Sequence, residues 1–260
     1  MHWCDTTQRS GLLLFADQDN AYPRVQWDYM FATMHTMNLH PDFITMVKTM
    51  YTDTNLRFKV NGVVDPHTAQ PKNGIAQGCP LSPQLYLMCI QGLLSLMNRD
   101  AQQPGGLQGI EVPDERGNVT STPQLYFSAF ADDVCLFLRD EDQLPRFKHL
   151  LGIYEIGAGA LNSWEKTIGM RIGTLRTSTH LPQGWVEGSD ITFAKPLDDN
   201  AVRYLGAFLG APEQVQRAWI KRTTEWVRDK AYRWAERSMP RTREVRLLHC
   251  ETASSHRCGT

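Results

Sequence analysis

Two adjacent aspartates in an apolar stretch are the residues of this sequence best suited to chemistry. Asp132 and Asp133 interrupt the hydrophobic segment from residue 125 to residue 138. Placing two carboxylates between apolar strands is costly unless their charges are paired or bound to a cation. The pattern predicts two strands joined by a tight turn that carries both aspartates. An ordinary aspartate-rich turn would give the same local pattern.

A third carboxylate follows a separate apolar run. Gly11 to Ala16 is predicted to be a buried strand, and Asp17 lies at its end. If this strand neighbours the aspartate turn, three carboxylates converge on one edge of a sheet. Such a cluster favours divalent cations with oxygen ligands, typically Mg²⁺, with Mn²⁺ as the alternative. Two ions about 3.5–4 Å apart can activate a hydroxyl and stabilise a leaving phosphate, which is the chemistry of nucleotidyl transfer.

The elements around these residues predict an α+β domain followed by a helical segment. The spacing of apolar residues and prolines predicts helices that begin at Pro23 and after Pro41, a helix over 84–98 and another over 143–157. Asn61-Gly62 predicts a hairpin turn. A short strand is expected over 203–209, and residues 214–248 are expected to be mostly helical with a break near Pro240. The predicted boundary lies near residue 212.

Composition restricts the class of protein. The chain has 260 residues, of which 42% are hydrophobic and 21% charged, as in folded globular proteins. No apolar run approaches the roughly 18–20 residues that span a bilayer, so no membrane partner is expected. The six cysteines are scattered without a CxxC pair, which favours neither a disulfide framework nor a common zinc finger. An intracellular protein is the expectation.

Charge is unevenly distributed. The formal net charge is −1, yet residues 217–247 carry ten lysines or arginines against four acidic residues. An acidic body with a basic C-terminal helix suits a metal site beside an element that contacts phosphates. A solvated amphipathic helix is the alternative on charge alone.

Five sequence blocks, in order, resemble the reverse transcriptase domain of non-LTR (LINE-type) retrotransposons. The first runs from Leu14 to Trp27 and contains Asp17 and Tyr22; the second joins Val60-Asn61-Gly62 to the loop from Gly74 to Pro83. The others run from Ala129 to Val134, from Leu161 to Thr167 and from Arg203 to Gly206. The resemblance covers most of the chain. It implies a polymerase palm, an antiparallel sheet with helices on one face, followed by a helical thumb-like segment.

The resemblance also implies roles for individual residues. Asp17, Asp132 and Asp133 match the catalytic, metal-binding aspartates, and Lys166 matches a lysine that assists the pyrophosphate leaving group. The nucleotide-binding positions that it implies are Ala16, Gln18, the sugar-selecting aromatic residue Tyr22, and the loop residues Gln77 and Gly78. A core aromatic residue, a loop-capping amide and a solvated lysine are the respective alternatives for Tyr22, Gln77 and Lys166.

The basic C-terminal helices resemble the thumb, which implies an RNA template and a DNA primer as partners and a dNTP as substrate. The candidate nucleic-acid contacts are Arg222, Arg228, Lys230, Arg233 and Arg237. Aromatic residues interleave with these cations, although aromatic residues at helical spacing more often belong to a core.

The sequence also departs from the family pattern. Only sixteen residues precede Asp17, so the fingers are expected to be largely missing; residues 1–212 are assigned to the palm and 213–260 to a partial thumb. RNA-directed DNA polymerisation is the predicted function, and nuclear action is expected from the family role. The alternatives are a catalytically inactive retroelement remnant and a nucleic-acid-binding module that uses the basic helices.

Overall fold

A computed structural model describes residues 10–111, 124–194, 201–210 and 212–235. Contacts divide the chain into two compact units, Met1–Ala194 and Lys195–Thr260. The first contains the aspartates and the second contains the basic helix. The assignment of residues 1–212 to a palm and 213–260 to a thumb stays a prediction.

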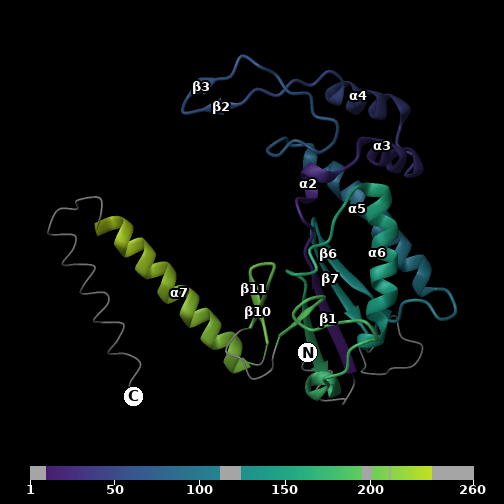
Figure 1. Cartoon of the computed structure of the whole chain (residues 1–260), viewed down its shortest axis with the longest axis vertical. Helices are drawn as coiled ribbons and strands as arrows, with labels where there is room; N and C mark the ends of the chain where they lie inside the picture. The colour runs from purple at the N-terminus through teal and green to yellow at the C-terminus, as the bar shows by residue number, and fades with distance from the viewer. Residues whose placement is uncertain (1–9, 112–123, 195–200, 211, 236–260) are drawn as a thin grey trace. The chain divides into compact units, whose positions relative to one another are not determined.

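A five-stranded sheet forms the centre of the first unit (Figure 1). The predicted apolar strand is confirmed and is the middle strand, with antiparallel neighbours on both sides. The predicted α+β fold is also confirmed, although the last strand runs parallel to its neighbour. In spatial order the strands are β6 (Phe127–Phe130), β7 (Asp133–Leu138), β1 (Ser10–Ala16), β8 (Ile168–Gly173) and β9 (Thr192–Phe193).

The core lies where one face of the sheet meets the helices. In β1, Leu12 and Leu14 alternate with residues of the other face, as the two-residue period of a strand requires. These side chains pack with α5 (Ser82–Ala101) and α6 (Leu144–Ala158), whose Leu85, Leu93 and Phe147 are fully buried. The two helices also contact each other. The strand that directly precedes Asp17 is therefore held in place by its core contacts.

The predicted helix beginning at Pro23 is two helices, so the expectation of one continuous helix was wrong. The short α2 (Ala21–Arg24) ends at Val25, whose ψ of 119° is not helical, and α3 (Trp27–Thr36) follows. The carbonyl groups of Tyr22 and Val25 accept hydrogen bonds from Ile75 and Gly74, at 2.9 and 2.8 Å. The neighbouring loop is therefore bound to the backbone where the two helices meet.

Several other predicted elements are confirmed. The helix after Pro41 is α4 (Pro41–Tyr51). The hairpin β2 (Lys59–Val60) and β3 (Val63–Val64) turns at Asn61 and Gly62, whose φ values of 49° and 85° match the two-residue turn that this pair favours. A further pair of short strands, β4 (Ile110–Glu111) and β5 (Gln124–Leu125), is antiparallel.

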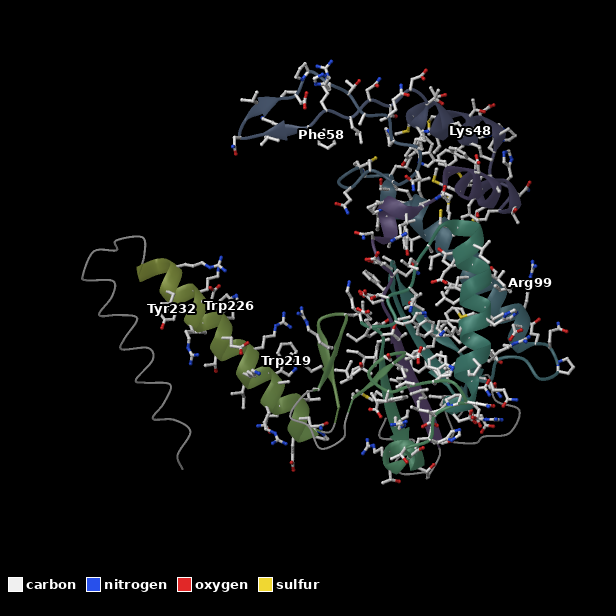
Figure 2. The ribbon with its side chains drawn as sticks, viewed as in Figure 1. Lys48, Phe58, Arg99, Trp219, Trp226 and Tyr232 are labelled. Carbon is white, nitrogen blue, oxygen red and sulfur yellow. The ribbon has the colours of Figure 1, made fainter. Side chains whose placement is uncertain are left out.

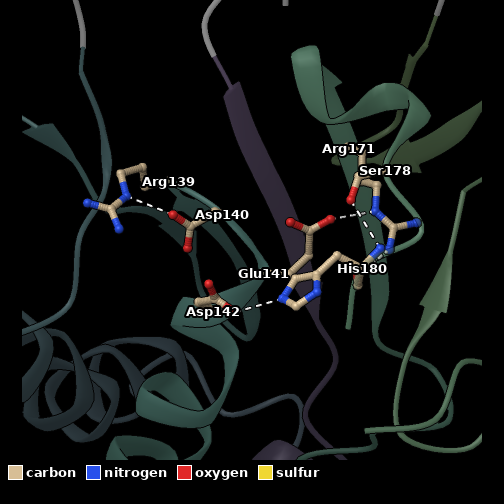
Figure 3. A network of polar contacts seen from close by, with 7 residues as sticks. All are labelled: Arg139, Asp140, Glu141, Asp142, Arg171, Ser178 and His180. Carbon is tan, nitrogen blue, oxygen red and sulfur yellow. Dashed lines mark hydrogen bonds and ion pairs between the residues drawn. The ribbon is translucent and has the colours of Figure 1, made fainter. Parts of the chain in front are cut away.

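A polar network ties the short helix η1 (Glu141–Gln143) to β8 and to the chain beyond it (Figure 3). Arg171 of β8 donates through Nε to Glu141 Oε1 at 2.7 Å and through Nη2 to the His180 carbonyl at 3.1 Å. His180 in turn pairs with Asp142 at 2.8 Å. The Glu141–Arg171 pair is almost fully buried, with side-chain exposures of 2% and 9%. Another short helix, η2 (Thr174–Thr177), follows β8 directly.

The second unit consists of a hairpin and a long helix. Strands β10 (Val202–Tyr204) and β11 (Ala207–Leu209) pair, so the strand expected over 203–209 is a hairpin. Helix α7 (Pro212–Ala235) packs on it through the edge-to-face rings of Phe208 and Trp219, with centroids 5.1 Å apart. The predicted break near Pro240 lies outside the described residues. None of the helices in the described ranges is long and apolar enough to cross a membrane.

Candidate active site

The three aspartates lie at neighbouring ends of β1 and β7. Ala16, the last residue of β1, is paired with Val134 of β7. Because the strands are antiparallel, the residue after Ala16 and the residue before Val134 are neighbours, and these are Asp17 and Asp133. Asp133 is the first residue of β7 and faces Phe130 of β6, whereas Asp132 lies in the turn. The turn also places Ala131 at a φ of 54°, a conformation unusual for a residue other than glycine. The prediction that both aspartates lie within the turn was therefore correct only for Asp132.

The carboxylates influence one another electrostatically. Partial desolvation raises the pKa of Asp133 above its usual range, and the negative charges of Asp132 and Asp17 raise it further. Asp132 and Asp133 are both exposed, so their oxygens are accessible to ligands. An accessible cluster of mutually repelling carboxylates has the donor chemistry that a hard divalent cation requires. Within the described residues, however, no three Asp, Glu, His or Cys side chains are arranged closely enough to hold a metal ion.

Lys166 lies beside the first aspartate. Its Nζ is 3.6 Å from Asp17 Oδ2, and the side chains are 64% and 47% exposed, so the pair is solvent-screened. The backbone fixes this neighbourhood more firmly: Ser163 donates to the Asp17 carbonyl at 2.8 Å, and Asp19 donates to the Leu161 carbonyl at 2.8 Å. The loop that carries Lys166 is thus attached to the segment that follows β1.

Tyr22 and Gln18 meet at a residue that the sequence patterns did not indicate. The ring of Tyr86 stacks on that of Tyr22 with centroids 4.9 Å apart and planes 11° from parallel. The Tyr86 hydroxyl donates to Gln18 Oε1 at 2.8 Å. Burial raises the pKa of Tyr22, and the charge of Asp132 raises it further, which places this ring near the aspartates. Tyr86 is the one aromatic residue in the sequence of α5, the only signal that could have singled it out.

The loop with Gln77 and Gly78 is anchored at both ends. Beyond the bonds of Gly74 and Ile75 to the Tyr22 region, the Ser82 hydroxyl donates to the Ala76 carbonyl at 2.6 Å. Gln77 and Gly78 lie between these anchors and are exposed. The positive φ of Gly78, 83°, is a conformation that favours glycine. The structure thus links this loop to the segment carrying Tyr22 while leaving its tip open to solvent.

The predicted nucleic-acid contacts lie on α7, with one exception. Arg222 lies 5.6 Å from the ring centroid of Trp219, and Lys230 lies 5.7 Å from that of Trp226. Arg233 forms an ion pair with Asp229, while Arg228 is exposed. Arg237 lies outside the described residues. Most of these cations are accessible to a ligand on the helix surface.

Comparison with known proteins places the chain in a family. Residues 1–208 match the family model described as reverse transcriptase (RNA-dependent DNA polymerase). The chain belongs to the reverse transcriptase family. The resemblance inferred from the five sequence blocks is therefore confirmed.

Two relatives and one solved structure illustrate the likeness of this reverse transcriptase domain. A 149 kDa protein of the Xenopus laevis transposon TX1 is 30% identical over 82% of this chain, which spans 15% of that protein. A mitochondrial protein of Arabidopsis thaliana is 37% identical over 30% of the chain and 57% of its own length. The structure of telomerase from Candida tropicalis in complex with a fragment of telomeric RNA matches 79% of this chain and 29% of its own, with a TM-score of 0.53 at 11% identity. At that identity the likeness concerns the fold alone.

Proposed function

We propose that this reverse transcriptase domain is an RNA-directed DNA polymerase that transfers nucleotides from a dNTP to a DNA primer paired with an RNA template. The proposal rests above all on the position of Asp17 and Asp133 at adjacent strand ends, with Asp132 in the adjoining turn. Membership of the family also supports the proposal. Because the chain spans only 15% and 57% of the two relatives, the activity of any longer protein that contains it is likewise a proposal.

The aspartates would hold two Mg²⁺ ions, with Mn²⁺ as the alternative. When bound, such ions supply charge stabilisation for the attacking and leaving oxygens. The raised pKa of Asp133 supports this assignment, because a cation would relieve the repulsion that causes it. Since the aspartates do not form a closed ligand set in this structure, we expect ion and nucleotide binding to draw them together.

Other residues would position the substrates. Lys166, beside Asp17, is suited to stabilise the negative charge of the pyrophosphate leaving group. The Tyr22 ring would lie beneath the sugar and disfavour a 2′-hydroxyl. The backbone near Ala16 and the Gln18 amide would lie beside the triphosphate, and Gln77 and Gly78 beside the incoming base pair. The cations of α7 would contact the phosphates of the template and primer.

Mg²⁺-dependent primer extension tests the function. The purified chain is incubated with an RNA template, a DNA primer and dNTPs, next to the variant Asp132→Asn/Asp133→Asn. We expect extension by the parent chain and its loss in the variant, because two metal ligands lose their charge. Asp42→Asn, an exposed aspartate on α4, is the matched control and should leave extension unchanged. Equal extension by the parent and the double variant would refute the proposal.

Nucleic-acid binding without polymerisation is the second candidate function. The cations and exposed aromatic side chains of α7 favour it, since phosphates and bases are recognised by these groups. In that case a salt-dependent RNA complex would form equally well with the parent chain and the double aspartate variant, and no primer would be extended. Nuclear action remains a prediction from the family role.

A further inference from the structure

One buried tyrosine contacts two of the proposed nucleotide-binding residues at once. Through its ring Tyr86 touches Tyr22, and through its hydroxyl it holds Gln18. We propose that Tyr86 is a positioning residue that couples Gln18 to Tyr22 and so sets how strongly the site prefers deoxynucleotides to ribonucleotides. This inference rests on the proposed polymerase function.

The ring of Tyr86 acts as a fixed support. Tyr86 is 1% exposed and lies among the buried residues of α5, including Leu85 and Ile90, so its ring cannot move without disturbing the core. Tyr22 is only partly buried and stacks nearly parallel on this ring. A side chain that excludes a 2′-hydroxyl by steric clash must not be displaced by that hydroxyl. The stacked ring of Tyr86 prevents displacement of the Tyr22 ring in one direction.

The hydroxyl of Tyr86 acts on the amide of Gln18. Burial, followed by the negative charge of Asp132, raises the pKa of Tyr86, so the hydroxyl stays protonated and remains a donor at physiological pH. Because the amide oxygen of Gln18 accepts this bond, its NH₂ group remains the donating end. The hydrogen bond therefore fixes the orientation of the Gln18 amide independently of the ring stack.

The two contacts can be separated by substitution. Tyr86→Leu removes ring and hydroxyl, whereas Tyr86→Phe keeps the ring and removes only the hydroxyl. In primer extension we expect the ratio of kcat/KM for dATP to that for ATP to fall about tenfold in Tyr86→Leu, the worth of a stacked aromatic pair. Tyr86→Phe should retain the ratio and raise KM for both nucleotides about fivefold, the worth of one hydrogen bond.

The control is a buried aromatic residue that contacts neither Tyr22 nor Gln18. Phe147 of α6 is 0% exposed and packs edge-to-face with Trp164, with ring centroids 6.2 Å apart. Phe147→Leu removes a ring of similar burial and should lower stability while leaving the nucleotide preference unchanged. The role of the Tyr86 ring would be overturned if Tyr86→Leu kept the preference, or if Phe147→Leu reduced it equally. An unchanged KM in Tyr86→Phe would overturn that of the hydroxyl.

Failure of this inference is distinguishable from failure of the proposed function. If the parent chain extends primers and Tyr86→Leu keeps its preference, polymerisation stands and the role of Tyr86 falls. If the parent chain does not extend primers, equilibrium binding of dATP and ATP with Mg²⁺ provides the test. The parent chain should then bind dATP more tightly than ATP, whereas Tyr86→Leu should bind the two nucleotides with similar affinity. The same ratio of affinities in both proteins would overturn the inference.

Discussion

Asp133 occupies a position where its own ionisation is disfavoured. Desolvation and the charges of Asp132 and Asp17 raise its pKa. Natural proteins commonly retain such unfavourable groups at functional sites, where a ligand compensates for them. The repulsion among these carboxylates is thus a reason to expect that binding of a cation stabilises the folded chain.

Neutralising Asp133 should stabilise the protein while abolishing activity. A carboxyl whose folded-state pKa is raised destabilises the fold above that pKa, and this cost disappears below its unfolded pKa, ordinarily about 3.9. Asp133→Asn should therefore raise the free energy of unfolding at pH 7 by roughly 0.3–0.5 kcal/mol, a small value because the side chain is exposed. Urea denaturation at neutral pH and below pH 4 measures the difference, which should fade in acid. A reduced stability at pH 7 would contradict this explanation.

The residues of the site were only partly predictable from sequence. Asp17, Asp132 and Asp133 were predicted to converge because each adjoins an apolar run, and the structure places them at adjacent strand ends. Tyr86 was not predictable in this way, because its contacts depend on how α5 packs beside the residues after β1. A hydrogen bond between residues 18 and 86 leaves no local trace in the sequence.

At the scale of elements, the buried pair Glu141–Arg171 fixes η1 against β8. Arg171 also lies 3.7 Å from the ring centroid of Phe193 in β9, so the guanidinium group of this β8 residue contacts both η1 and β9. Removing one member of a buried ion pair leaves the other charge without compensation. We therefore expect the stability of the sheet edge formed by β8 and β9 to depend on Arg171.

Arg171→Met should lower the free energy of unfolding by about 3–5 kcal/mol, the usual cost of an uncompensated buried charge. Thermal or urea denaturation of the purified variant measures it. Arg139→Met is the matched control, because Arg139 forms an ion pair with Asp140 at the surface and is 53% exposed. Arg139→Met should lower the free energy of unfolding by less than about 1 kcal/mol. If the two variants were equally destabilised, the importance assigned to burial would be wrong.

Strand β8 shows why some elements escaped prediction. Its sequence contains two glycines and an arginine, which neither alternate clearly nor favour a strand. The reasons are tertiary: Gly169 leaves room for the Phe193 ring, since a Cβ there would approach Phe193 Cε1 to 2.7 Å, and Arg171 meets buried Glu141. The helices with regular apolar spacing and the Asn61-Gly62 hairpin were predictable because their signals are local.

At the scale of the whole molecule, charge and exposed rings gather on α7. The side chains of Trp219, Trp226 and Tyr232 project from this helix and are 44%, 60% and 67% exposed (Figure 2). The chain as a whole carries a net charge of −1. Local cations, not the total charge, would therefore provide its attraction to phosphates.

Replacing Arg222, Arg228, Lys230 and Arg233 together by glutamine should weaken RNA binding and flatten its dependence on salt. Each phosphate that the variant no longer neutralises should reduce the slope of log K against log salt by about 0.7–0.9. Fluorescence anisotropy with labelled RNA over a salt series measures the slope. Arg99→Gln/Arg139→Gln, which removes two cations of the first unit, is the control and should keep the parent slope. Equal slopes for all three proteins would show that these cations of α7 do not contact the RNA.

The central place of β1 has a consequence for biosynthesis. Leu12 pairs with Leu138 on one side and with Arg171 on the other, so this early strand stays unpaired until much of the chain has been translated. At roughly 5–20 residues per second, the delay is on the order of ten seconds. During that interval the segment Ser10–Ala16 exposes an uncharged apolar run of the kind that aggregates. The strand that positions Asp17 is therefore a segment of the nascent chain that a chaperone would protect.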